Sequence, residues 1–440
     1  MKTYLLLAAS CFFPAIISAE SVKDREGAVR QDKAVMEQNG RWIYNDIDAA
    51  FAKAKETGKP LMVVLRCVPC ISCMELDAEV VELKGGLEPL ADQFICARII
   101  NANTFDLSLF QFDYDVSFAA MFFNGDRTIY GRFGTRAQKD SRAQDVTLSG
   151  FKKALEGALE LHRGYPANQA ALAGKKGPPK AEKTPLDYPM LNSKYKPELD
   201  WAGKVVGSCI HCHMLREAER TTLRSQGKPL PEALIYPSPL PESIGLTLSR
   251  DERAQVTGVA ADSPAGIAGF QKGDRISALE GQPLISIADF QWVLDHAPAT
   301  GKLQAIVNRE GKSMEITLTL PDGWRSRQDI SWRPTTWGLR QMIGGMFTED
   351  PGDELRAERG LKKDEMALLI KHIGEYGPHA AAKNAGFKVD DVITSIDGKT
   401  ARLSESALLG YLIQNKKPGE KVPATVLRGG QRIDLMVPVQ

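Results

Sequence analysis

Five of the seven cysteines in this 440-residue chain stand in two short clusters. The first, Cys67-Val68-Pro69-Cys70-Ile71-Ser72-Cys73, holds two overlapping pairs with CxxC spacing. It follows an apolar run at residues 61–65 that predicts a buried strand, and it precedes a helical pattern at residues 74–83. Free N–H groups at a helix N-terminus stabilise a thiolate, and Arg66 is expected to add to the effect. The spacing predicts redox chemistry, with a structural disulfide as the alternative.

The second cluster is Cys209-Ile210-His211-Cys212-His213. In an exported protein, CxxCH is the attachment signature of c-type haem, with thioethers at Cys209 and Cys212 and with His213 as the iron ligand. Its alternatives are a second dithiol and a zinc site, although zinc lacks an obvious partner pair at ligand spacing. The candidates for a distal haem ligand are Met190, Met214 and His162.

The first 19 residues predict a secretory signal peptide, because Lys2 precedes an apolar run at residues 4–17 and the small pair Ser18-Ala19. Cleavage there removes Cys11, leaves no membrane span and sends the chain to the periplasm or beyond. An oxidising compartment favours disulfides, redox-active thiols or cofactor attachment for the six remaining cysteines. Lipidation of Cys11 is the alternative.

The composition belongs to an ordinary globular protein, with 43% hydrophobic and 25% charged residues. The length predicts about two to four domains and excludes a collagen-like or wholly disordered chain. Basic and acidic residues number 56 and 55, so the net charge is +1. Neutralising phosphates needs an excess of Lys and Arg, so we expect no nucleic-acid partner.

Residues 40–163 predict an α/β domain. Apolar runs at residues 61–65, 94–100, 119–123 and 128–133 predict strands, and residues 151–162 predict a closing helix. Strands that alternate with helices imply a mostly parallel sheet. Residues 164–238 carry the CxxCH cluster and a Lys/Pro-rich stretch, which predicts a semi-extended linker.

The remainder of the chain repeats itself. Residues 268–276 match residues 385–393 without a gap, and Gly281 matches Gly398 at the same offset. Each match is followed by a predicted helix and a strand pair. We therefore expect two copies of one small β-rich domain, at residues 239–322 and 329–440, and a multidomain fold that is α/β plus mainly β.

The first cluster resembles the dithiol of thioredoxin-like proteins, which lies at the same strand-to-helix junction. The resemblance implies Cys70 as nucleophile and Cys73 as resolving thiol, with Cys67 as a third participant. Alignment places Ser117 where thioredoxins have a cis-proline facing the dithiol, a departure that puts peptide docking there in doubt. Cys96, inside an apolar strand, is expected to be a buried packing residue.

The two copies resemble PDZ domains of the bacterial periplasmic type. That family binds a peptide's C-terminal carboxylate in a backbone loop while the peptide adds a strand to the sheet edge. The resemblance implies peptide-binding loops at Ser243, Ile244, Gly245 and Leu246 in the first copy and at Thr336, Trp337, Gly338 and Leu339 in the second. Packing modules without a ligand are the alternative for either copy.

The whole arrangement resembles a family of thioredoxin-like/PDZ (seleno)proteins of planctomycete-type bacteria, as does the segment at residues 128–134. Some members carry selenocysteine at a redox position. The resemblance implies an exported thiol-disulfide oxidoreductase that acts on disulfide substrates, while its PDZ domains recruit peptide or protein partners. The alternative is a non-catalytic periplasmic adaptor with a structural thioredoxin-like module.

Overall fold

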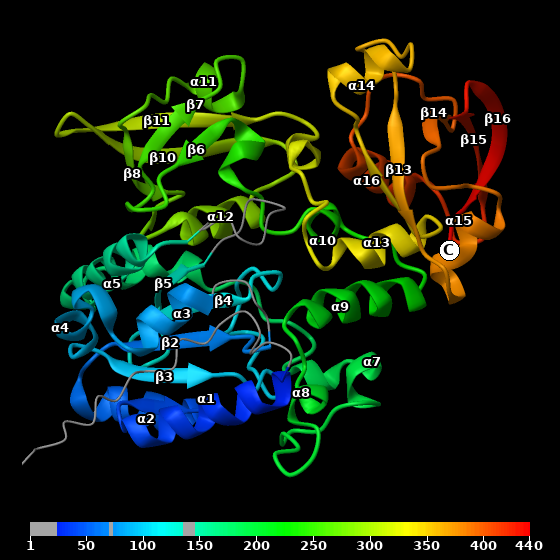
Figure 1. Cartoon of the computed structure of the whole chain (residues 1–440). Coiled ribbons are helices and arrows are strands. Elements are labelled where there is room, and N and C mark those ends of the chain that lie inside the picture. Colours follow the sequence, from blue (N-terminus) through cyan, green and yellow to red (C-terminus); the bar gives the residue numbers. More distant parts are fainter. Residues whose placement is uncertain (1–23, 70–73, 135–145) are drawn as a thin grey trace, which may run out of the picture.

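The computed structural model describes residues 24–69, 74–134 and 146–440. It shows three folded units joined by a helical segment (Figure 1). The catalytic pair expected from the sequence, Cys70 and Cys73, lies outside the described residues, as does the predicted signal peptide. No helix in the described ranges is long and apolar enough to cross a bilayer.

The first unit is built on a five-stranded sheet in the order β1-β3-β2-β4-β5. Its strands are β1 (Trp42–Tyr44), β2 (Leu61–Arg66), β3 (Ile95–Ile99), β4 (Phe118–Phe123) and β5 (Ile129–Phe133). β1 and β2 run parallel to β3, but β4 is antiparallel to β2 and β5 to β4. The sheet is therefore mixed rather than mostly parallel. The connection at residues 100–117 brings β4 in antiparallel to β2, and the short turn after Phe123 folds β4 and β5 into a hairpin.

Helices cover both faces of this sheet. They are α1 (Arg25–Asn39), α2 (Ile47–Thr57), α3 (Met74–Val81), α4 (Glu88–Ala91) and α5 (Leu148–Arg163). α2 packs on one face, whereas α3 and α5 pack on the other. The start of α2 is fixed by Asp46, whose side chain accepts from the Ala49 N–H at 2.9 Å, and its end by Gly58 at φ 67°.

The segment at residues 164–238 is folded, in contrast to the linker expected from its composition. It forms α6 (Gln169–Leu172), η3 (Ala173–Lys175), η4 (Pro185–Asp187), α7 (Pro189–Asn192), α8 (Val205–Ser208), α9 (His213–Ser225) and α10 (Glu232–Ile235). Leu191, Ile210 and Leu215 from this segment are buried in the same apolar cluster as α2. A few apolar residues in this mostly polar segment thus pack it against the thioredoxin-like domain.

The predicted repeat forms two β-rich units. The first contains η5 (Pro241–Ile244), β6 (Leu246–Leu248), β7 (Val256–Val259), α11 (Pro264–Ala268), β8 (Arg275–Leu279), β9 (Gln282–Pro283), α12 (Ile287–Asp295), β10 (Gly301–Arg309) and β11 (Lys312–Leu320), with η6 (Trp324–Arg327) after it. The second contains α13 (Thr336–Met342), β12 (Met346–Glu349), α14 (Asp353–Glu358), β13 (Leu368–Ile373), η7 (Gly377–Ala380), α15 (Ala381–Asn384), β14 (Val392–Ile396), α16 (Glu405–Asn415), β15 (Lys421–Arg428) and β16 (Gln431–Pro438).

One ion pair recurs at the same place in both copies. Arg309 Nε donates to Asp274 at 2.7 Å, and Arg428 Nε donates to Asp391 at 2.6 Å. Each arginine also donates through Nη2 to the carbonyl of a glycine with positive φ, at 2.8 Å in both copies. The two aspartates are the matching acids of the sequence repeat, so the structure confirms the internal duplication.

The units are joined by buried polar contacts. α12 of the first copy lies against β5 (Figure 1), where the Arg132 N–H donates to Asp289 at 3.1 Å. Ahead of the second copy, Arg333 Nη1 donates to Asp113 at 2.8 Å and to Asp115 at 3.1 Å. All three side chains of this second contact are at most 5% exposed.

We expect Arg333→Met to lower the free energy of unfolding by about 3–5 kcal/mol, because it leaves Asp113 and Asp115 buried without a counter-charge. Urea denaturation followed by circular dichroism measures the loss. The control, Arg127→Met, breaks an exposed pair with Asp48 and is expected to cost less than about 1 kcal/mol. Equal losses in the two variants would contradict this account.

Candidate functional site

The described part of the first cysteine cluster lies where β2 ends. The Cys67 N–H donates to the carbonyl of Ser117 at 3.1 Å. Arg66 Nη1 joins the same two backbones, because it donates to the Cys67 carbonyl at 2.6 Å and to the Ser117 carbonyl at 2.9 Å. Ser117 therefore lies beside the cluster, at the start of β4, as the sequence predicted.

Arg66 also makes contacts away from the cysteine cluster. The thiolate stabilisation expected from the sequence concerns Cys70 and Cys73, which lie outside the described residues, and stays a prediction. The guanidinium of Arg66 is buried, and its Nε donates to Asp77 of α3 at 3.2 Å. Asp77 also pairs with Arg98, which in turn binds Asp32 of α1. Burial acts to raise the pKa of Asp77, but Arg98 and Arg66 outweigh it and the pKa is lowered. The arginine thus belongs to a buried ion network that holds α1, α3 and the strand end together.

The second cysteine cluster docks against the first. His211 Nδ1 lies 3.2 Å from Cys67 Sγ, although the two residues are 144 positions apart. The docking is held by the Ile210 N–H, which donates to Asn103 Oδ1 at 2.7 Å, and by Cys209 Sγ, which lies 3.2 Å from the Ile100 carbonyl. The CxxCH segment is therefore part of the thioredoxin-like site.

A small cavity of about 30 Å³ separates the two clusters. Three of its lining residues are Cys67, Cys209 and Cys212, and most of the others are apolar. No disulfide joins two of the described cysteines to each other. Three half-buried cysteine side chains and one half-buried imidazole thus share a small, mainly apolar space that is accessible enough for thiol chemistry.

Sequence reasoning missed His211. It weighed His213 as an iron ligand, whereas within the described contacts His211 is the histidine that lies against Cys67. His213 begins α9, and its ring stacks near that of His211 with the centroids 5.7 Å apart. The available signal was the histidine inside the CxxC pair, but its partner follows only from the docking of the segment.

The described surroundings of the CxxCH motif do not fit a haem. Thioether bonds would place the macrocycle at the sulfurs of Cys209 and Cys212, where the structure has the small cavity and the thioredoxin-like domain. The ring nitrogens of His162 contact Tyr130 Oη and the Gly58 carbonyl. Haem attachment is supported by the motif alone and stays a prediction.

The methionines considered as distal haem ligands and the zinc alternative can also be compared with the structure. Met214 Sδ accepts from Tyr195 Oη at 3.4 Å, and Met190 is an exposed side chain on α7. For zinc, the described residues contain no group of three or more His, Cys, Asp or Glu side chains that could hold a metal ion.

The first peptide-binding loop has the local geometry expected from the sequence. Ser243 and Ile244 end η5, Gly245 has φ 84°, and Leu246 begins β6. Within the described residues β6 pairs only with β7, so its other edge carries no ladder partner there. A strand edge beside a glycine loop is the arrangement that accepts an extended peptide.

The second predicted loop is misplaced. Trp337, Gly338 and Leu339 lie in the helix α13, and Leu339 is fully buried in the core of the second copy. The structural counterpart of Gly245 is Gly345: Ala260 N donates to the Gly245 carbonyl, and Gly374 N donates to the Gly345 carbonyl, both at 2.9 Å. The run Ile343-Gly344-Gly345-Met346 before β12 was the sequence signal for this loop.

The groove beside β12 is partly closed by the chain itself. Glu405 of α16 accepts from the Thr348 N–H at 2.8 Å, and Arg340 of α13 pairs with the same carboxylate at 2.6 Å. An amide of β12 that could bind a peptide strand is thus already bonded. The second copy is therefore less suited to peptide binding than the first.

Comparison with known proteins confirms the domain types. A sequence model of a thioredoxin-like family matches residues 29–125, and one of the PDZ domain matches residues 243–320 and 368–439. The chain thus contains a thioredoxin-like domain and two PDZ domains in a multidomain fold. The thioredoxin-like/PDZ (seleno)protein family is not confirmed by these matches.

Relatives among curated proteins are described as probable periplasmic serine endoproteases, DegP-like. The one from Pseudomonas savastanoi is 35% identical over 44% of this chain and 38% of its own length. The one from Marinomonas is 28% identical over 43% of this chain and 38% of its own length. The chain therefore spans well under half the length of these relatives.

Solved structures also match in part. An HtrA-type protease, AlgW, with tripeptide is 18% identical, covers 31% of this chain and 52% of that chain, and has a TM-score of 0.20. AlgW with decapeptide is 19% identical, covers 42% of this chain and 55% of that chain, and has a TM-score of 0.22.

The expected burial of Cys96 is confirmed, since it is 2% exposed and burial raises its pKa to about 12. At pH 8 we expect iodoacetamide to alkylate Cys96 roughly 1,000-fold more slowly in the native chain than in urea, because the thiolate is scarce and shielded. Mass spectrometry of the Cys96 peptide measures the rate. Similar rates in both states would overturn this expectation.

Proposed function

We propose that this chain is an exported thiol-disulfide oxidoreductase in which the docked CxxCH segment serves as a second dithiol. The observation that carries the proposal is the 3.2 Å contact between Cys67 Sγ and His211 Nδ1. It joins two cysteine clusters that are far apart in the sequence. Cys209 and Cys212 line the same small cavity as Cys67, which favours exchange between the clusters.

The proposed chemistry is thiol-disulfide exchange. The thiolate of Cys70 attacks a substrate disulfide, forms a mixed disulfide and releases one substrate thiolate, which takes up a proton. Cys73 then attacks Cys70, so that the enzyme gains a disulfide and the substrate leaves as a dithiol. Cys67 next attacks Cys70 and releases Cys73. Cys212 attacks Cys67 and releases Cys70, and Cys209 then attacks Cys212 and releases Cys67. The pair Cys70/Cys73 is thus reduced again, and the pair Cys209/Cys212 carries the disulfide.

His211 has a defined part in this scheme. An imidazole beside a thiol accepts its proton or, once protonated, stabilises the thiolate. His211 is placed to do this for Cys67, the third thiol of the cluster. The buried network of Arg66, Asp77 and Arg98 holds the strand end that positions Cys67.

Export to the periplasm belongs to this proposal. Its support is the signal-like pattern at residues 1–19 and the similarity to DegP-like proteins that are probable periplasmic endoproteases. An oxidising compartment supplies disulfide substrates for such a chain. The PDZ domains would recruit peptide or protein partners, chiefly through the first copy.

A non-catalytic periplasmic adaptor is the second candidate. Ser117, rather than a proline, lies beside Cys67, and this favours a thioredoxin-like module that does not dock peptides at the cluster. If the chain is an adaptor, Cys70 and Cys73 stay oxidised at a reduction potential low enough to reduce a thioredoxin. Thiol trapping across a redox titration distinguishes the two candidates.

The oxidoreductase is tested by insulin reduction with dithiothreitol as electron donor. We expect Cys70→Ser to lose activity and His211→Asn to reduce the rate about tenfold or more, because the thiol of Cys67 loses its neighbouring proton acceptor. The control is His379→Asn, in the second PDZ domain. If the unmodified chain and Cys70→Ser reduce insulin equally poorly, the oxidoreductase is excluded.

Peptide recruitment is tested by fluorescence anisotropy with a labelled peptide whose last residue is apolar and whose C-terminal carboxylate is free. Gly245→Val is expected to weaken binding at least tenfold, because φ is 84° and a Cβ would meet Ser263 at 2.1 Å. The matched variant Gly345→Val, in the partly closed copy, is expected to leave binding unchanged. A peptide amide that binds as tightly as the carboxylate would contradict C-terminal recognition.

A further inference from the structure

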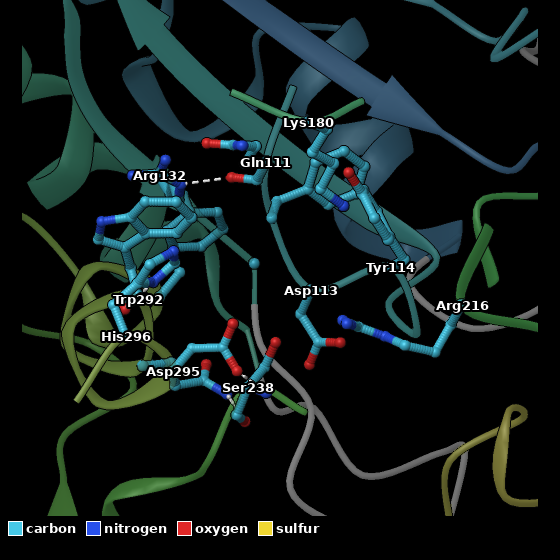
Figure 2. A pocket seen from close by; sticks show the side chains of 15 residues that line it. Gln111, Asp113, Tyr114, Arg132, Lys180, Arg216, Ser238, Trp292, Asp295 and His296 are labelled. Carbon is cyan, nitrogen blue, oxygen red and sulfur yellow. Dashed lines mark hydrogen bonds between the residues drawn. The ribbon is translucent and has the colours of Figure 1, made fainter. Parts of the chain in front are cut away.

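A second cavity lies where the thioredoxin-like domain, the connecting segment and the first PDZ domain meet (Figure 2). It has a volume of about 90 Å³ and is continuous with solvent. One buried water needs about 10–15 Å³ by such a measure, so the cavity holds several water-sized groups. Among the described residues, the linings of this cavity and of the cavity between the cysteine clusters have no residue in common.

Arg132 of β5 supplies a buried cation to this cavity. Its side chain is among the largest fully buried ones, at 1% exposure, and its guanidinium lies 3.7 Å from the ring centroid of Trp292. Nε donates to the Gln111 carbonyl at 2.6 Å and Nη2 to the Lys175 carbonyl at 2.5 Å. Nη1 has no hydrogen-bond partner within the described ranges.

No described carboxylate pairs with this guanidinium. Asp289 accepts from the backbone N–H of Arg132 at 3.1 Å and pairs with Lys175 Nζ at 2.9 Å instead. Burial lowers the pKa of Arg132 to about 10, which reflects the cost of holding its charge away from water. A buried donor without an acceptor is costly, so an anion at Nη1 would stabilise the site.

The same cavity offers acceptors from α12. Gln291 is 3% exposed, and its Nε2 donates to the Ser238 carbonyl at 3.1 Å while Oε1 has no partner among the described residues. Asp295, four positions later and hence on the same helix face, accepts from the Ser238 N–H at 2.7 Å. In the view of Figure 2, Arg132 lies on one side of His296, and Asp295 and Ser238 lie on the other.

The other charged groups that line the cavity, among the residues that the structure describes, have counter-ions. Asp113 is bound by Arg333, and Lys180 and Arg216 both pair with Glu219. The cavity therefore presents a cationic donor at one end and a carboxylate with an amide oxygen at the other. This pattern complements a molecule that carries both charges.

We propose that the cavity binds a small zwitterion of amino-acid or dipeptide size, with its carboxylate on Arg132 and its ammonium group on Gln291 and Asp295. The site is separate from the thiol cluster and lies against α12 of the first PDZ domain. A ligand there contacts two domains at once, so binding would also hold those domains together.

The proposal is tested by equilibrium dialysis of the full mature chain against radiolabelled glycine, glycylglycine, acetate and ethylammonium. We expect saturable binding of glycine or glycylglycine at one site per chain, at least tenfold tighter than binding of acetate or ethylammonium. Arg132→Met is expected to weaken zwitterion binding at least tenfold. Gln291→Met, which removes only the amide acceptor, is expected to weaken it as well.

Circular dichroism and urea denaturation confirm that each variant is folded, and Gln291→Met keeps the test decisive if Arg132→Met does not fold. The control Arg127→Met removes an exposed cation elsewhere and is expected to bind as the unmodified chain does. Absence of saturable binding by both zwitterions would overturn the proposal. Acetate that binds as tightly as glycine, or binding unchanged in both cavity variants, would overturn it too.

Discussion

The buried pairing of Arg333 with Asp113 and Asp115 is the constraint on which the arrangement of domains depends. Two carboxylates taken out of water need a cation with good hydrogen-bond geometry, and the thioredoxin-like domain does not supply it there. The cation comes from the segment just ahead of the second PDZ domain, 220 residues away. The loop so held leads directly into Ser117, so a contact between domains also fixes the wall of the thiol site.

The connecting segment shows how an apparent linker becomes part of a site. Its Ile210 is buried among residues of the sheet layer, and the Ile210 N–H donates to Asn103. That anchoring places His211 beside Cys67. The burial of Leu191, Ile210 and Leu215 and the hydrogen bond to Asn103 thus bring together two cysteine clusters that are far apart in the sequence.

The duplicated PDZ domains share a framework but differ at the groove. Both keep the Asp–Arg pair that ties the glycine turn to a later strand. In the second copy Glu405 and Arg340 occupy the strand edge, whereas in the first copy α12 packs on the thioredoxin-like domain through Asp289. The duplication was readable because a contiguous stretch repeats, but the misplaced loop at Trp337 arose because helix and loop both fit a Trp-Gly-Leu run.

The sequence by itself determined the local elements, the repeat and the two cysteine motifs, because apolar periodicity, glycine turns and Cys spacing are encoded within short windows. It also predicted the burial of Cys96 and the position of Ser117. Only the tertiary structure decided that residues 164–238 fold onto the sheet, that His211 meets Cys67, and that Arg132 lines a cavity between domains. Those features depend on contacts between residues far apart in the chain. The free energy of those contacts stabilises them, and a short stretch of sequence does not reveal which distant residues will meet.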